Sequence, residues 1–334
     1  MNKTPSFPFL VADIGGTNAR FGIVSGAKDD NGRFLIKYQK TYQCAEFNSF
    51  ESVLSAYLKT LSSKPKYACI AVAGPVIGES IKMTNLNWSF TIEALCHDFE
   101  MTSIKVINDF GALAYSTLYL QKNEIDVLYS GNEEATDYHS ASRALVGPGT
   151  GLGVASLIKT PQHWQPICGE GGHVSFAPLN DFEVELRNTI LKAANKNHVC
   201  IEDVVSGPGL VNIYRTHCHI NNAKEQTLTP NNISSKARTE SDEQCIATMK
   251  TFSQLLGSVA GDIALTMGAF GGVYLGGGIL PKIIGMIDKD LLIERYLRKG
   301  VQQDLLERIP IYLISSDVPA LTGAAHWMYD TYLE

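Results

Sequence analysis

The segment Asp13-Ile14-Gly15-Gly16-Thr17-Asn18-Ala19-Arg20 lies between two apolar stretches, 9–14 and 20–24, whose pattern predicts strands. Glycines let the backbone approach a phosphate closely and adopt positive φ, so successive N–H groups can form an anion-binding nest. Thr17 and Asn18 add side-chain donors, and Asp13 is placed to hold Mg²⁺ through water, since Mg²⁺ usually keeps part of its hydration shell. On its own, the segment fits a plain hairpin turn with an Asp cap equally well.

A second turn of the same kind, Gly147-Pro148-Gly149-Thr150-Gly151-Leu152-Gly153, follows the predicted strand 144–146. Two such turns facing one another could clamp a triphosphate from both sides. Neither contains G-x-G-x-x-G, and neither is followed by the Lys of a P-loop, which disfavours a dinucleotide enzyme or a Walker-type NTPase. We therefore expect nucleotide phosphates at Gly15, Gly16, Thr17, Asn18, Gly149, Thr150 and Gly151.

A third glycine-rich segment, 271–279, includes Gly276, Gly277 and Gly278 after the predicted strand 273–275. Its bare backbone could let an adenine lie flat against it. The alternative, a helix packed closely on glycine, explains the segment as well when it is taken alone.

Candidate acceptor-side residues follow other predicted strands. Asn108 and Asp109 end the strand 104–107 and open a helix, so both side chains could project into a cleft, although both residue types also suit an N-cap. Phosphoryl transfer to an alcohol needs a group that takes the hydroxyl proton. Oriented carboxylate, imidazole and amide groups match what sugar hydroxyls need, and the candidates for that role are Asn85, Glu170, His173 and Glu202.

The size and order of the predicted elements favour two α/β domains. At 334 residues the chain exceeds what one core usually organises. Strands interleave with helices, and the strand–glycine turn–strand unit occurs twice, which indicates two related halves. Further strands are predicted at 67–72 and 311–314, and helices at 50–61, 111–120, 183–194, 209–218, 242–267 and 320–332.

The composition limits partners and compartment. The net charge is −6 and no long basic run occurs, so nucleic acid and anionic membranes are not expected partners. No stretch is long and apolar enough to span a bilayer, and no signal peptide is recognisable at the N-terminus. The seven scattered cysteines are typical of free thiols in a reducing cytosol, so we expect a cytoplasmic protein.

Cys and His residues also gather between 168 and 219, but without the paired spacing of zinc ligands. Structural zinc is therefore disfavoured, and a Cys–His nucleophile lacks an oriented third partner.

Together the motifs closely resemble the bacterial glucokinase family. The resemblance rests on D-I-G-G-T-N-A-R, I-N-D-F at 107–110, G-P-G-T-G-L-G-V, G-E-G-G-H-V-S-F-A-P, S-G-P-G-L-V-N, F-G-G-V-Y-L-G-G-G-I and V-P-A-L-T-G-A-A, in order from about residue 8 to 330. It implies a ribonuclease H-like (actin/hexokinase-like ATPase) fold, with two α/β domains flanking a catalytic cleft. The domains would be 1–119 plus 316–334 and 120–315. The C-x-C-G-type zinc motif of the related repressor/kinase (ROK) group is absent and no helix-turn-helix segment precedes Phe9, which favours the zinc-free branch.

The resemblance also implies an activity and roles for individual residues. Asp109 would be the base in ATP- and Mg²⁺-dependent phosphorylation of glucose at the 6-hydroxyl, feeding glycolysis. Asn108, Glu170, His173 and Glu202 would bind the sugar, and Gly276 to Gly278 would lie near adenosine. A homodimer is implied as well. A kinase for another sugar or a small carboxylic acid, and a non-catalytic sugar sensor, remain alternatives; a sensor would not need the base at Asp109.

Overall fold

The computed structural model describes residues 6–83, 86–132, 140–316 and 318–332. Its strands are β1 Phe9–Ile14, β2 Asn18–Lys28, β3 Phe34–Gln43, β4 Tyr67–Val72, β5 Ser80–Lys82, β6 Ser89–Thr91, β7 Ser103–Asn108, β8 Ile125–Tyr129, β9 Arg143–Pro148, β10 Leu152–Lys159, β11 Trp164–Gly169, β12 Val273–Leu275 and β13 Ile311–Ile314. Its helices are α1 Phe50–Leu58, α2 Ile92–Asp98, α3 Asp109–Ser116, α4 Asp181–Ala194, α5 Gly207–Ile220, α6 Pro230–Arg238, α7 Glu243–Met267, α8 Leu280–Ile283, α9 Lys289–Leu297, α10 Gln303–Leu306 and α11 Pro319–Tyr332.

Two sheets repeat one strand order. The first runs β3-β2-β1-β4-β7 and the second β11-β10-β9-β12-β13-β8, while β5 and β6 form a separate hairpin. In the first, β1 pairs antiparallel with β2 and parallel with β4, which pairs parallel with β7. In the second, β9 is parallel to β12 and β12 to β13, whereas β8 is antiparallel to β13. Each glycine turn follows the strand at the same place in this order, as the duplicated pattern predicted.

The chain forms two compact units. Unit 1 comprises 1–124, 155–169 and 316–334, and unit 2 comprises 125–154 and 170–315. The domain limits expected from the sequence, 119/120 and 315/316, stay a prediction.

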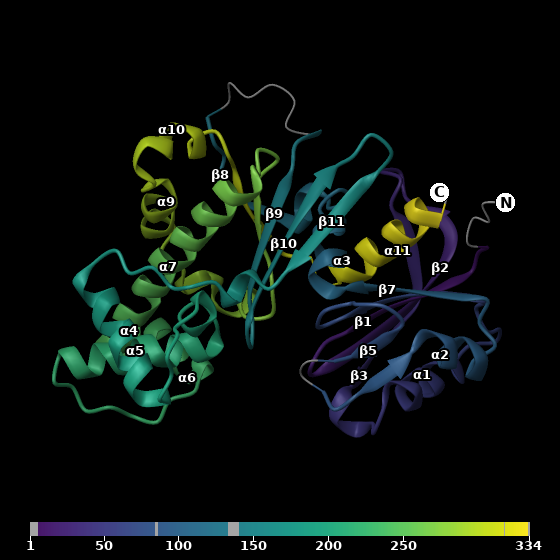
Figure 1. Cartoon of the computed structure of the whole chain (residues 1–334), viewed down its shortest axis with the longest axis horizontal. Coiled ribbons are helices and arrows are strands. Elements are labelled where there is room, and N and C mark those ends of the chain that lie inside the picture. The colour runs from purple at the N-terminus through teal and green to yellow at the C-terminus, as the bar shows by residue number, and fades with distance from the viewer. Residues whose placement is uncertain (1–5, 84–85, 133–139, 317, 333–334) are drawn as a thin grey trace. The chain divides into compact units, whose positions relative to one another are not determined.

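Unit 1 buries both faces of its five-stranded sheet. Alternate residues of β1 point to opposite faces, as the pleat requires. Leu10 joins the cluster formed with α1 and α2, while Val11 joins the cluster formed with α11. Figure 1 shows α11, in yellow, beside α3, with α1 and α2 on the other side of the strands. A Cβ at Gly323 would overlap the Ala112 carbonyl, so glycine is required where α11 crosses α3.

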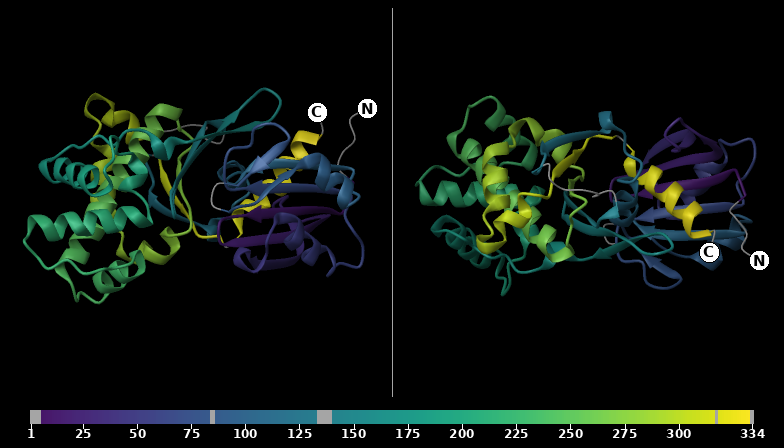
Figure 2. Two further views of the ribbon diagram at one scale, coloured as in Figure 1. Left: turned by 60° about the horizontal axis from the view of Figure 1, so that its bottom comes forward. Right: turned by 90° about the horizontal axis from the view of Figure 1, so that it is seen from above.

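Unit 2 has a core of its own. Helices α4 to α7, teal to green in Figure 2, contribute most of its helical side chains, and α7 is buried along most of its length. This helix ends at Gly268, whose left-handed conformation (φ 56°) is typical of a glycine cap. The shorter elements β8, β11, α2, α6 and α9 were not predicted from the sequence.

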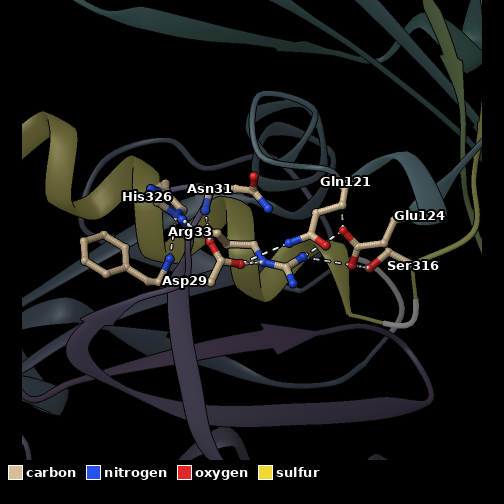
Figure 3. A network of polar contacts seen from close by, with 8 residues as sticks. Asp29, Asn31, Arg33, Gln121, Glu124, Ser316 and His326 are labelled. Atoms are coloured by element: carbon tan, nitrogen blue, oxygen red, sulfur yellow. Dashed lines mark hydrogen bonds and ion pairs between the residues drawn. The ribbon is translucent and has the colours of Figure 1, made fainter.

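A polar network in unit 1 connects the β2–β3 loop to residues 121–124, to Ser316, which precedes α11, and to His326 within α11 (Figure 3). Arg33 donates to both carboxylate oxygens of Glu124 (2.9 and 2.7 Å), and Ser316 donates to the same carboxylate (3.1 Å). His326 accepts the Phe34 N–H at Nε2 (3.1 Å) and stacks on Tyr119. Burial, with Lys28 nearby, lowers the pKa of His326 to about 3.

We predict that His326 makes unfolding pH-dependent. The unfolded chain binds a proton at this residue near pH 6.5 and the folded chain near 3, so stability is complete above pH 6.5 and falls as the pH drops toward 3. The limiting slope is about 1.4 kcal/mol per pH unit. His326→Gln keeps an acceptor for Phe34 but does not titrate. Urea unfolding at pH 6.5 and 4.5 should therefore show a loss smaller by up to about 2 kcal/mol in this variant.

His97→Gln, at an exposed position, is the matched control for a His-to-Gln substitution and is unfolded at the same two pH values. Equal pH slopes for wild type and His326→Gln would contradict the prediction.

Candidate functional site

The first glycine turn lies at the carboxyl edge of the sheet in unit 1. The parallel register places Ile14 beside Val72 and Val72 beside Asn108, so β1, β4 and β7 end side by side. Two hydrogen bonds extend this alignment beyond the strands: Ala73 N–H donates to the Ile14 carbonyl (3.1 Å), and Asn108 Nδ2 donates to the Gly74 carbonyl (2.9 Å). The turn and the Asn108–Asp109 pair therefore share one edge of the sheet.

The turn itself is a tight hairpin between β1 and β2. Gly15 N–H donates to the Asn18 carbonyl (3.0 Å), and Gly16 and Thr17 are exposed at the tip. Asn18 begins β2 and accepts a hydrogen bond from Gln43 at Oδ1 (2.8 Å). Neither glycine has the positive φ that the sequence argument invoked. The exposed tip nevertheless presents backbone that carries no bulky side chain.

Asp13, at the end of β1, pairs with Arg20 across the hairpin. Arg20 Nη1 donates to Asp13 Oδ2 (3.1 Å). Burial raises the pKa of Asp13, while Arg20 acts in the opposite direction. The described residues contain no group of three or more metal-ligating side chains. A single carboxylate beside a phosphate turn fits Mg²⁺, which proteins usually bind through one or two carboxylates, waters and substrate phosphates.

Asn108 and Asp109 open helix α3. Asn108 is its N-cap, with Oδ1 accepting the Gly111 N–H (3.1 Å), so the capping alternative raised by the sequence holds for this residue. Asp109 is the first helical residue and partly exposed, and its Oδ1 accepts the Phe110 N–H (2.9 Å). Asn85 lies outside the described residues.

A thiol without a role in the sequence-based prediction packs against α3, the helix that begins with Asp109. Cys168, near the end of β11, lies so close to Gly111 that a Cβ there would come within 2.6 Å of its sulfur. Cys168 is exposed to solvent. The protein atoms around its thiol nevertheless disfavour the thiolate and, together with the Asp109 charge, raise the pKa of Cys168 to about 11. No spacing rule in the sequence relates 168 to 109, so only the fold reveals this contact.

The second glycine turn, in unit 2, is held by its own backbone and by two neighbouring segments. Gly149 N–H donates to the Gly151 carbonyl (2.7 Å), and Gly207 N–H donates to the Gly149 carbonyl (2.8 Å). Thr150 is exposed at the tip. Gly277 has φ +93°, and a Cβ there would lie 2.7 Å from the Pro148 carbonyl oxygen. The third glycine segment thus packs directly on the second turn. This packing would allow one bound nucleotide to contact both segments.

Glu170, His173 and Glu202 gather around the strand that follows this turn. Glu170 precedes the short 3₁₀ turn Gly171–His173, and both Glu170 and His173 are exposed. A Cβ at Gly172 would overlap the Leu152 carbonyl, so glycine lets this loop pack on β10.

The segment that carries Glu202 is tied to the same loop. Ile201 N–H donates to the Val174 carbonyl (3.0 Å), which brings Glu202 beside the loop. Glu202 Oε2 accepts the Leu152 N–H (2.7 Å). Unit 2 therefore brings together three predicted sugar ligands and the second turn, and unit 1 brings together the first turn, Asn108 and Asp109.

Comparison with known proteins is consistent across sequence and structure. A family model described as Glucokinase matches residues 10–331. A glucokinase of Saccharophagus degradans is 39% identical over 323 residues, which cover 96% of this chain and 98% of the relative. The crystal structure of a glucokinase from an Antarctic psychrotroph is 38% identical, with a TM-score of 0.85 and coverage of 96% of this chain and 98% of that one.

A ROK family glucokinase from Streptomyces griseus, solved in complex with glucose and AMPPNP, shares the fold at 18% identity. Its TM-score is 0.60, with 96% of this chain and 98% of that chain covered. These likenesses confirm the predicted actin/hexokinase-like ATPase fold. In the described part of the chain, no helix is both long and apolar enough to cross a membrane.

We predict that Cys168 reacts slowly with alkylating reagents because the reactive species is the thiolate. With a pKa of about 11, its modification by iodoacetamide at pH 8 should be about 10- to 100-fold slower than in the urea-unfolded chain. Asp109→Asn should speed the reaction a few-fold, since one cause of the raised pKa is removed. Peptide mass spectrometry would follow this cysteine alone. Equal rates in folded and unfolded chains would refute the assigned environment.

Proposed function

The chain belongs to the glucokinase family, and we propose that it transfers the γ-phosphoryl group of ATP to the 6-hydroxyl of D-glucose with Asp109 as general base. Family membership confirms the resemblance drawn from the motifs. The observation that carries the residue assignment is the shared sheet edge, which holds the first glycine turn and Asp109 on neighbouring strand ends.

The surroundings of Asp109 suit a base. Its carboxylate is partly exposed, so an acceptor hydroxyl can reach it, and the Phe110 N–H holds one oxygen in place. Its position at the first residue of α3 places it where the helix dipole favours negative charge. In the proposed step the 6-oxygen bonds to the γ-phosphorus, the bond from that phosphorus to the ADP oxygen breaks, and the hydroxyl proton passes to Asp109.

The glycine turns and sugar ligands supply positioning. We assign the ATP phosphates to the exposed tips at Gly16–Thr17 and Gly149–Gly151, and the adenosine to Gly276–Gly278. Asp13 would hold Mg²⁺ through water, and the ion would neutralise charge on the phosphate oxygens when bound. Asn108, Glu170, His173 and Glu202 are assigned to glucose hydroxyls, with Asn85 as a further ligand.

Several finer assignments complete the proposal. We propose that the enzyme acts in the cytoplasm as a homodimer and feeds glycolysis. The seven scattered cysteines, a pattern typical of free thiols in a reducing cytosol, support the compartment. The two-domain division at 119/120 and 315/316 is kept as part of the same proposal.

Asp109→Asn tests the assignment of the base. The amide keeps an acceptor for Phe110 but takes up no proton, so kcat should fall by about 10²- to 10⁴-fold while the Kd for glucose stays nearly unchanged. ADP release and calorimetric glucose titration measure the two effects. Asp98→Asn, an exposed carboxylate on α2, is the matched control and should keep full activity. A kcat close to that of wild type in Asp109→Asn would contradict the assignment of Asp109 as the base.

Glu170→Ala and His173→Ala test the sugar ligands. Each should raise the KM for glucose much more than the KM for ATP, because a sugar hydroxyl loses its partner. His219→Ala, at an exposed position late in α5, serves as control and should change neither constant. Equal effects on the KM for glucose and the KM for ATP would contradict the assignment of Glu170 and His173 to the sugar.

A further inference from the structure

We propose that Glu202 is a positioning residue for the second glycine turn, and that it couples sugar binding to nucleotide binding. The proposal rests on the proposed function and deepens it. Under that function Glu202 is only a sugar ligand. The contacts within unit 2 indicate a second role for the same carboxylate, at the second glycine turn.

The first observation is a hydrogen bond to the backbone. Leu152 is the residue with which β10 begins, directly after the turn, and its N–H donates to Glu202 Oε2 at 2.7 Å. Bonds from N–H groups to a carboxylate are shorter and stronger than neutral ones. The end of the turn is therefore held by a charged side chain from another segment.

The second observation concerns the residue before Leu152. A Cβ at Gly151 would overlap Glu202 Oε2 and lie 3.1 Å from its Cδ. The φ of Gly151 is not in the left-handed region, so the backbone conformation alone does not demand glycine. The carboxylate occupies the space that a side chain at 151 would take, so any other residue there would have to displace Glu202 from its contact.

The segment that carries Glu202 is itself fixed and meets the turn at a second point. Ser206 Oγ donates to the Glu202 carbonyl (2.7 Å) and accepts the Gly209 N–H (3.0 Å), which anchors the segment to the start of α5. Gly207 N–H donates to the Gly149 carbonyl (2.8 Å). The segment thus contacts the turn at Gly149 and Leu152, on both sides of Thr150, the exposed tip that we assign to phosphate.

Coupling follows from the chemistry of a carboxylate, which accepts hydrogen bonds at two oxygens. Oε2 is committed to the turn, and Oε1 is assigned to a sugar hydroxyl. A sugar bound at Oε1 restricts rotation of the carboxylate, which orders its contact with Leu152 before the nucleotide arrives. Because coupling between two binding equilibria is reciprocal, the nucleotide must strengthen sugar binding by the same factor.

The test is calorimetric titration of the full chain with AMPPNP and Mg²⁺, with and without saturating glucose. For wild type we expect glucose to lower the Kd for AMPPNP by about fivefold or more. Without glucose, Glu202→Ala should raise that Kd by about 5- to 10-fold, because the Leu152 N–H loses its partner. In this variant, glucose at concentrations that saturate wild type should no longer change the AMPPNP affinity.

Two variants separate this role from sugar binding alone. Glu202→Gln keeps a carbonyl oxygen for Leu152, so without glucose it should bind AMPPNP within about twofold of wild type, and the gain on adding glucose should shrink. His173→Ala should weaken glucose binding while leaving AMPPNP binding without glucose unchanged. A Kd for AMPPNP equal to that of wild type in folded Glu202→Ala without glucose would overturn the proposal.

The remaining outcomes also support or overturn the proposal. If Glu202→Ala does not fold, Glu202→Gln settles the matter: a reduced effect of glucose on the AMPPNP Kd supports the proposal, and an unchanged effect overturns it. Failure of the proposed function looks different, since wild type would then release no ADP with glucose. AMPPNP binding without glucose would still report on the contact between Glu202 and the turn.

Discussion

The parallel pairing of β1, β4 and β7 is the constraint on which the chemistry in unit 1 depends. Its register places Ile14, Val72 and Asn108 in one row, so residues that follow these strands emerge together at one edge. The register of a buried sheet is strongly specified, because a shift by one residue would turn every apolar side chain of a strand to the opposite face. The first glycine turn and Asp109 inherit their proximity from this register.

In unit 2 the comparable constraint is close packing at glycine. Gly172, Gly207 and Gly277 each let one segment touch the β9–β10 turn or strand β10, and a side chain at Gly277 would meet backbone within 2.7 Å. Glycine at these three positions is needed for close approach, and at Gly277 also for its left-handed φ of +93°. This close packing brings Glu202 and the Gly276–Gly278 segment to the same turn, and the proposed coupling of sugar and nucleotide binding depends on it.

Much of this organisation could be predicted from the sequence. Strands 9–14, 67–72, 273–275 and 311–314 were placed correctly because they are short, buried and bounded by glycine, proline or polar residues. The edge strand β8 was missed because its mixed polarity carries little periodic signal, and α2 because it has only seven residues. Helix α6 was missed although its buried residues Ile233, Ser234 and Ala237 share one face. The contacts of Cys168 with Gly111, and of Glu202 with Leu152, join residues 57 and 50 positions apart, and no local pattern predicts such contacts.

The central claim is that the two turns and the base serve phosphoryl transfer to glucose. An assay of ADP release by the purified chain, with ATP, Mg²⁺ and a panel of hexoses and small carboxylic acids, tests it most directly. The account predicts that glucose gives the highest kcat/KM of the panel and that glucose 6-phosphate accumulates in step with ADP. A higher kcat/KM for another acceptor would redirect the claim to a different substrate. Absence of ADP release with every hexose of the panel would contradict it.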